Sequence, residues 1–165
     1  MATETETIGP ELKHSECVQE AAVHIFNSTC KLTVTPHDET QVGNSDVVIA
    51  IISLVGQVEW SVFIGLPRAT ACVCAARFAE FEIPYESGDM GDAVGELANI
   101  IAGDVKARLD ARGVKADISL PMVIRAKDIQ VLVQRNAMTL KQCYSSEPGP
   151  LWIGVTAGKG HSFVM

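Results

Sequence analysis

Residues 46–67 read DVVIAIISLVGQVEWSVFIGLP, and this stretch indicates the fold. Its first half is rich in β-branched residues and has no polar face, as in a strand that is buried on both sides. In its second half apolar residues such as Trp60 alternate with Glu59 and Ser61, which predicts a strand with one more polar face. The glycine and glutamine at 56–57 fit a tight turn, so we expect an antiparallel hairpin.

Three helices are expected around this hairpin. Before it, apolar residues recur at helical spacing over residues 11–30. After it, a proline opens a helix expected over residues 67–80. A longer helix is expected over residues 88–112, with Gly113 as its C-terminal stop. The polar segment 35–45, which precedes the hairpin, predicts a loop.

Beyond Gly113 the chain turns to strand character. The expected strands are ADISLPMVI (116–124), DIQVLVQ (128–134), AMTLKQCY (137–144) and PLWIGVTA (150–157). This order of elements does not alternate as in a doubly wound fold, so we expect an α+β fold with helices packed on a largely antiparallel β-sheet. The acidic and polar start of the chain predicts a flexible tail at 1–10, and the length of 165 residues predicts a single domain at 11–165.

Composition and charge exclude several classes of partner. The net charge is −7, and we find no cluster of lysine and arginine, so neither nucleic acid nor an anionic membrane is expected as a partner. The longest apolar run, residues 47–55, is too short to span a bilayer. The N-terminal sequence MATETETIGPE is acidic and polar, unlike a signal peptide. We therefore expect a cytoplasmic protein.

The sequence contains no recognisable metal or nucleophile motif. The five cysteines have neither the spacing of a disulfide framework nor that of a zinc site, and we interpret them as small buried hydrophobic residues. The four histidines show no HExxH spacing, and no serine lies in a G-x-S-x-G turn. We expect no metal site, and an unrelated hydrolase is the least favoured function.

The helix expected at 88–112 carries a continuous polar stripe. At about 100° per residue, its apolar positions gather on one side, namely Met90, Val94, Leu97, Ile101 and Val105. The polar stripe lies opposite and consists of Asp92, Glu96, Asn99 and Gly103. Gly95 lies at the edge of the stripe, and bare backbone there would let another molecule approach closely.

An ordinary amphipathic helix is the alternative interpretation, because every such helix has a polar face. In that case Asp92 would be a residue of the helix start, placed three positions after a cap at Asp89 and favoured by the helix dipole. The glycines would then serve close packing between helix and sheet.

The segment DAVGELANIIAG, residues 92–103, resembles the signature of the CheC/CheX/FliY phosphatases of bacterial chemotaxis. That signature is an Asp/Ser-x3-Glu-x2-Asn pattern on a helix, and Asp92, Glu96 and Asn99 match it. The following strand ISLPMVI is also similar to the family. One intact motif in a short chain resembles CheX, whereas CheC-type members carry the motif twice. Arg125 departs from the family, which often has a glycine there.

The resemblance implies a CheC/CheX-like fold and a phosphatase that hydrolyses the aspartyl phosphate of a CheY-like response regulator. Asn99 would orient the attacking water, and Glu96 would pair with a lysine of the regulator, a role we favour over general base. The partner-binding set would be Asp92, Gly95 and Gly103, with helix capping as the other role for Asp92.

The same resemblance implies a homodimer and no cofactor of the protein's own, with Mg²⁺ expected on the regulator. The main alternative is a non-catalytic CheX-like module that binds a response regulator or a switch component without hydrolysing it.

Overall fold

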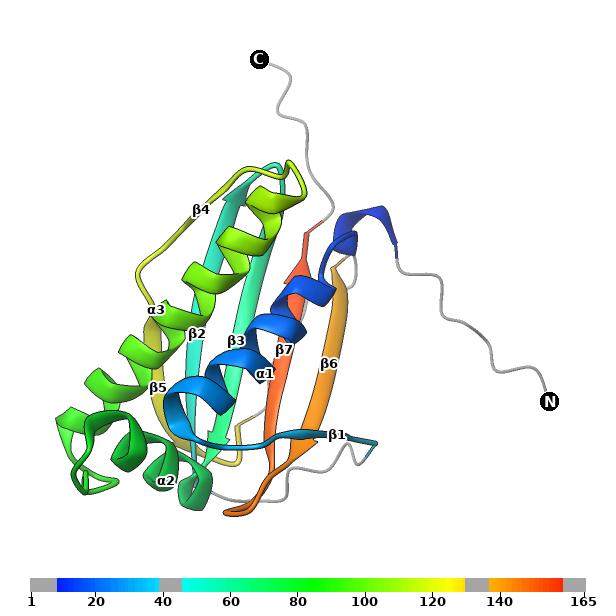
Figure 1. Cartoon of the computed structure of the whole chain (residues 1–165). Coiled ribbons are helices and arrows are strands. Elements are labelled where there is room, and N and C mark those ends of the chain that lie inside the picture. The colour runs from blue at the N-terminus through cyan, green and yellow to red at the C-terminus, as the bar shows by residue number, and fades with distance from the viewer. Residues whose placement is uncertain (1–8, 39–45, 130–136, 159–165) are drawn as a thin grey trace.

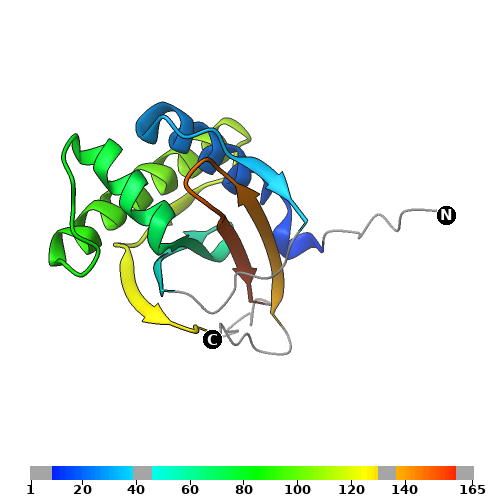
Figure 2. The ribbon, with the colours of Figure 1, turned by 90° about the horizontal axis from the view of Figure 1, so that it is seen from below.

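The computed structural model describes residues 9–38, 46–129 and 137–158. In chain order the elements are η1 (Pro10–Leu12), α1 (Glu16–Cys30), β1 (Thr35–His37), β2 (Asp46–Gly56), β3 (Glu59–Pro67), α2 (Arg68–Ala79), α3 (Gly88–Ala111), β4 (Ala116–Ile118), β5 (Met122–Lys127), β6 (Met138–Ser145) and β7 (Leu151–Ala157). Within these ranges seven strands form one sheet, and the three α-helices cover one of its faces (Figures 1 and 2). This confirms the expected α+β fold.

The predicted hairpin lies inside the sheet, between β7 and the edge formed by β4 and β5. β2 and β3 pair antiparallel from Val47 opposite Pro67 to Val55 opposite Glu59. The strand order is β1-β6-β7-β3-β2-β4, with β5 also on β2, and every pair is antiparallel. The sheet is thus built outward from the stretch at 46–67.

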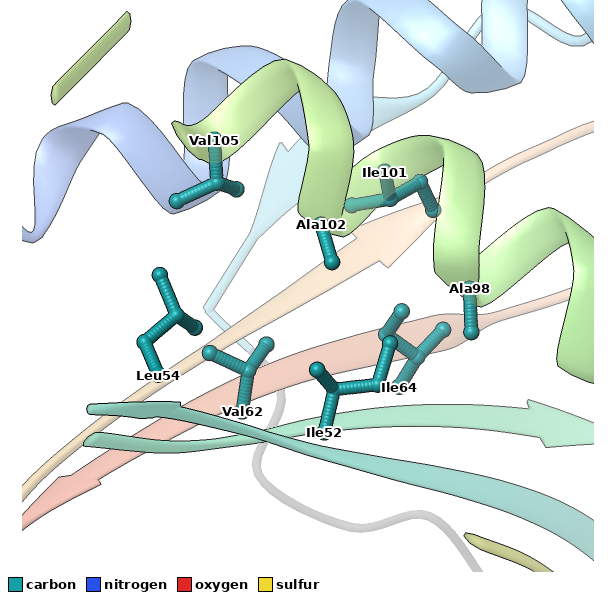
Figure 3. Close-up of a pocket in the computed structure, with 8 residues that line it drawn as sticks. All are labelled: Ile52, Leu54, Val62, Ile64, Ala98, Ile101, Ala102 and Val105. Atoms are coloured by element: carbon teal, nitrogen blue, oxygen red, sulfur yellow. The ribbon is translucent and has the colours of Figure 1, made fainter. Parts of the chain in front are cut away.

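The main core lies between the sheet and the helices. Alternate residues of β2 and β3 point to α3, and Figure 3 shows Ile52 and Ile64 facing Ala98 and Ala102. The gap left between them is an apolar cavity of about 10 Å³, near the smallest volume that holds a water molecule. α3 is therefore packed directly on the sheet, and this cavity is no ligand site.

α3 ends where the sequence predicts. Gly113 has a φ of 75°, and its N–H donates to the carbonyl of Asp110, while the N–H of Val114 donates to that of Leu109. These two bonds form a Schellman motif, which needs a residue in the left-handed region that glycine adopts without strain.

Among the described residues, no helix is long and apolar enough to cross a membrane.

The first helix differs from the prediction at its start. A 3₁₀ turn at Pro10–Leu12 precedes α1, which begins only at Glu16. Between them His14 has a φ of 72°, and this left-handed conformation interrupts a helix. Most of the tail predicted at 1–10 lies outside the described residues.

Two strand predictions also need correction. The segment expected to be a loop contains β1, which lies at the sheet edge and includes Pro36, where a missing N–H is tolerated. The strand expected at 116–124 is divided into β4 and β5. The strand expected at 128–134 falls largely outside the described residues.

Candidate functional site

The structure places the polar stripe on the outer side of α3. Asp92, Glu96 and Gly103 are exposed and Asn99 is half-buried. The opposite apolar set predicted from the sequence is buried, namely Met90, Val94, Leu97, Ile101 and Val105. The helix therefore presents the stripe to solvent and packs its other side on the core, as its periodicity predicts.

The side chains of the stripe are free to bind something else. Within the described residues the side chains of Asp92, Glu96 and Asn99 make no hydrogen bond or ion pair. The second half of α3 is different, because all its charged residues form ion pairs: Asp104 with Arg108, Lys106 with Asp117, and Asp110 with Lys115. Paired charges are typical of a surface helix. The unpaired polar side chains of the stripe therefore have no evident role within the described fold.

One flank of the stripe borders the chain between β4 and β5. A β-carbon added at Gly95 would lie 3.4 Å from Val123 Cγ2 and 3.7 Å from Pro121 Cγ. Farther along α3, Lys106 Nζ donates to the carbonyl of Ala116 at 2.7 Å. The helix and this segment therefore run side by side in opposite directions, as Figure 1 shows.

Asn99 lies between these two contacts. On a helix of about 100° per residue it is turned only about 40° from Gly95, whereas Glu96 is turned about 100°. Asn99 is thus the member of the stripe nearest to the β4–β5 segment, and Glu96 points more directly outward. This placement explains why Asn99 is half-buried and Glu96 exposed.

The β4–β5 segment contains a bulge, which we call the corner and define as Ser119–Pro121. Leu54 of β2 pairs with Ile118, and Ile51 pairs with Met122. Two residues of β2 therefore oppose the three residues of the corner, which is one residue more than a regular ladder holds. A proline inside a strand pattern is a sequence signal for such a bulge, but it does not place the corner beside the stripe.

Gly95 has a packing role that its pattern does not reveal. It is buried, and the contacts of its added β-carbon are with the corner and β5. Gly103 is exposed and has nothing within 4 Å. Of these two glycines, Gly103 is the one that leaves bare backbone open to solvent, and partner contact by either stays a prediction.

The start of α3 is held by Arg125, whose role we did not predict. Its Nη1 donates to the carbonyl of Tyr85 at 2.9 Å and to that of Ser87 at 3.1 Å. Ser87 is the N-cap residue, so the predicted cap at Asp89 is wrong, and Asp92 lies beyond the first turn. The capping role for Asp92 is therefore excluded.

Tyr85 forms the other part of this anchor. Arg68 lies over its ring at 4.5 Å and forms ion pairs with Asp46 and Glu86. Burial raises the pKa of Tyr85, and its hydroxyl has no partner among the described residues. Arg125, which stands where the family often has a glycine, thus ties the connection before α3 to the sheet.

Two further titratable groups with shifted pKa, Cys30 and Cys74, are associated with α1 and α2 and not with α3. A hydrogen bond with Cys74 lowers the pKa of Cys30, and the same contact raises that of Cys74. These thiols join α1 to α2, where both are buried. In the part of the chain that the structure describes, no three His, Cys, Asp or Glu side chains are grouped to hold a metal ion.

Comparison with known protein families identifies the family of this chain. The profile described as chemotaxis phosphatase CheX matches residues 48–143, which is more than half of the chain and includes the whole stripe. The chain belongs to the CheX family of chemotaxis phosphatases. This confirms the resemblance seen in residues 92–103. A search of curated proteins finds no match.

Solved structures of CheX and CheC-like proteins share the fold. CheX from Vibrio vulnificus matches with a TM-score of 0.78 at 19% identity, over 90% of this chain and 98% of that chain. A CheC-like superfamily protein from Shewanella sp. PV-4 gives 0.77 at 18% identity, over 90% and 98%. The CheX-CheY-BeF3-Mg²⁺ complex from Borrelia burgdorferi gives 0.69 at 23% identity, over 87% and 96%.

Proposed function

We propose that this CheX-family protein hydrolyses the aspartyl phosphate of a CheY-like response regulator. The observation that carries the proposal is the pair Glu96 and Asn99, which lies on the outer side of α3 with no partner among the described residues. The CheX of Borrelia burgdorferi was solved with CheY, BeF3 and Mg²⁺, and this family relationship supports a CheY-like regulator as the partner.

The reaction requires little chemistry from the protein itself. A water oxygen attacks phosphorus in line as the bond between phosphorus and the aspartyl oxygen breaks. The products are the aspartate carboxylate and inorganic phosphate, and the proton of the water passes to solvent. Because phosphoryl transfer proceeds through a loose transition state, positioning and charge neutralisation dominate catalysis.

Asn99 is the residue proposed to position the water. Its amide both donates and accepts hydrogen bonds, and as a neutral group it does not repel a phosphoryl group. Asn99 is half-buried, so the neighbouring corner restricts its side chain on one flank. The amide of Asn99 nevertheless has no partner within the described residues. A water held there would be oriented by a group that needs no change of protonation.

Glu96 is proposed to fix the register of docking. It is exposed one helical turn from Asn99, where its carboxylate can pair with a lysine of the regulator. Asp92 and Gly103 extend the same face and are proposed as peripheral contacts, and buried Gly95 would act by setting the distance from α3 to β5. Mg²⁺ would be held by the regulator.

A homodimer is proposed as the assembled form. Among the described residues, β1 pairs only with β6, while β4 and β5 pair only with β2, so both sides of the sheet end in strands with one unpaired edge. Such edges are common sites of strand pairing between copies. A mass by light scattering near 17.7 kDa, that of one chain, would contradict the dimer.

The proposed activity is tested by following loss of phosphate from a phosphorylated CheY-like regulator of the same organism. Wild-type protein should accelerate the loss of phosphate, and Asn99→Ala should abolish the acceleration. Glu96→Ala should raise the concentration of regulator needed to reach half of the maximal rate. Binding without acceleration would favour the non-catalytic module instead.

A further inference from the structure

The corner presents an apolar side chain that the fold leaves uncovered. Leu120 is 88% exposed, the highest value among the large hydrophobic residues that the structure describes. The other described leucines are buried, apart from half-buried Leu140. The core therefore does not need Leu120, and a polar residue at this position would leave the packing unchanged.

The backbone of the corner is firmly held. Ser119 N–H donates to the carbonyl of Ser53 at 2.9 Å, and Ser53 N–H donates to Ser119 Oγ at 2.9 Å. Pro121 fixes its own φ and packs at Gly95. Leu120 thus stands between two anchored residues, so a partner that covers it would have little backbone to order.

The corner is continuous with the polar stripe. It passes α3 between the contact at Gly95 and the contact of Lys106 with Ala116, and Asn99 is the stripe residue that faces this interval. A molecule that places its phosphoryl group at Asn99 must therefore also approach the corner. Bulges commonly redirect a side chain next to an active site.

Charge gives a reason for an apolar contact here. The chain has a net charge of −7, and two of its carboxylates, Asp92 and Glu96, lie unpaired in the stripe. Long-range attraction to a phosphorylated and hence anionic site is therefore not expected. Affinity must then come from local contacts, and the cores of transient interfaces are apolar.

We propose that the corner at Ser119–Pro121 is the apolar part of the docking surface for the response regulator, with Leu120 as its main contact. This inference rests on the proposed function, because it takes the regulator as the molecule that covers the stripe. It adds a contact outside the motif that sets affinity and takes no part in the chemistry.

The test measures the affinity for the regulator with Mg²⁺ and beryllofluoride, which mimics a phosphoryl group and cannot be hydrolysed. Leu120→Ser should raise the Kd about tenfold, as expected for loss of one buried apolar side chain. In the hydrolysis assay the same variant should raise KM similarly and leave kcat within about twofold, since a uniform binding contact is lost.

Val55→Ser is the matched control. Val55 is 59% exposed and lies on β2, the strand that pairs with β4 and β5. Because it follows core residue Leu54, its side chain is on the face of the sheet away from the helices. Its Kd should equal that of wild type, and both variants should melt near the wild-type temperature.

An unchanged Kd for Leu120→Ser would overturn the proposal, as would a wild type that does not bind the activated regulator. A dimer that becomes a single chain in Leu120→Ser, with Kd unchanged, would assign the corner to a second copy and also overturn it. Because the Kd is read without turnover, the result does not depend on whether the protein hydrolyses phosphate.

Discussion

Gly95 of α3 lies directly against Val123 of β5, since a β-carbon added to the glycine would lie 3.4 Å from Val123 Cγ2. This contact sets the distance between the helix that carries the stripe and the edge of the sheet. Gly91 and Gly103 have nothing within 4 Å of an added β-carbon. The glycines of α3 therefore have different roles, although they look alike in the sequence.

Enlarging the residue at position 95 should displace the sheet edge. Gly95→Leu is expected to lower the free energy of unfolding by about 1–3 kcal/mol, because the larger side chain has no room beside Val123. Gly95→Ala should be tolerated, because 3.4 Å is an ordinary contact distance and alanine favours the helix by about 1 kcal/mol. Urea denaturation measures both, and a Leu variant as stable as wild type would contradict the packing described.

Gly103 and Gly91 form a matched pair for testing close approach by a partner. Alanine at either position should stabilise α3 by about 1 kcal/mol, because both are helical and open. If the regulator approaches the backbone of the stripe, Gly103→Ala should also weaken its binding, whereas Gly91→Ala should not. Equal affinities for both variants would remove Gly103 from the docking surface.

Arg125 should contribute to stability through the start of α3. Arg125→Ala is expected to lower the free energy of unfolding by about 1 kcal/mol, since two hydrogen bonds to backbone carbonyls are lost at a site partly open to water. Lys127→Ala is the control on the same strand, because its ion pair with Asp46 is long, at 3.8 Å, and its side chain is 78% exposed. Equal denaturation midpoints for the two variants would show that Arg125 does not anchor the helix.

The elements with strong periodicity were predictable from sequence. The apolar side of α3 recurs at helical spacing, and the halves of the hairpin differ in their polar faces, so both elements were expected where they occur. The break before α1 was not, because nothing in the apolar pattern of residues 11–30 marks the left-handed conformation of His14. The pattern at 116–124 contains a proline, but only the pairing with β2 reveals the bulge.

The site was predictable in its residues and not in its surroundings. A helix spacing rule places Asp92, Glu96 and Asn99 on one side of α3, whatever packs beside them. That Gly95 is buried, that Pro121 of the corner lies beside it and that Arg125 holds the helix start depends on which strand edge lies next to α3. Those contacts join residues far apart in the chain, so they cannot be predicted from a single sequence.

Stability should fall at high pH through Tyr144. Its hydroxyl donates to Gln19 Oε1 at 2.6 Å, and burial raises the pKa of Tyr144 to about 12. The unfolded pKa is about 10. The folded state therefore favours the neutral phenol, and this contribution is full below pH about 10 and is lost as the pH rises to about 12, on the order of 2 kcal/mol in total.

Tyr144→Phe isolates this effect from other titrating groups. The variant should lose about 1 kcal/mol near neutral pH, where the hydrogen bond is missing. Between pH about 10 and 12 its stability should fall less steeply than that of wild type. The free energy of unfolding, measured by chemical denaturation at several pH values, gives both pH dependences. If it falls equally steeply with pH in the two proteins, the assignment to Tyr144 is contradicted.

The central claim is that Asn99 orients the water that attacks the phosphoryl group. The most direct test compares Asn99→Ala with wild type in two assays on one regulator, namely phosphate loss at saturating protein and binding of the beryllofluoride form. The account predicts that acceleration falls by about 100-fold or more while the Kd stays within about threefold. Acceleration that survives in a folded Asn99→Ala protein would contradict the account.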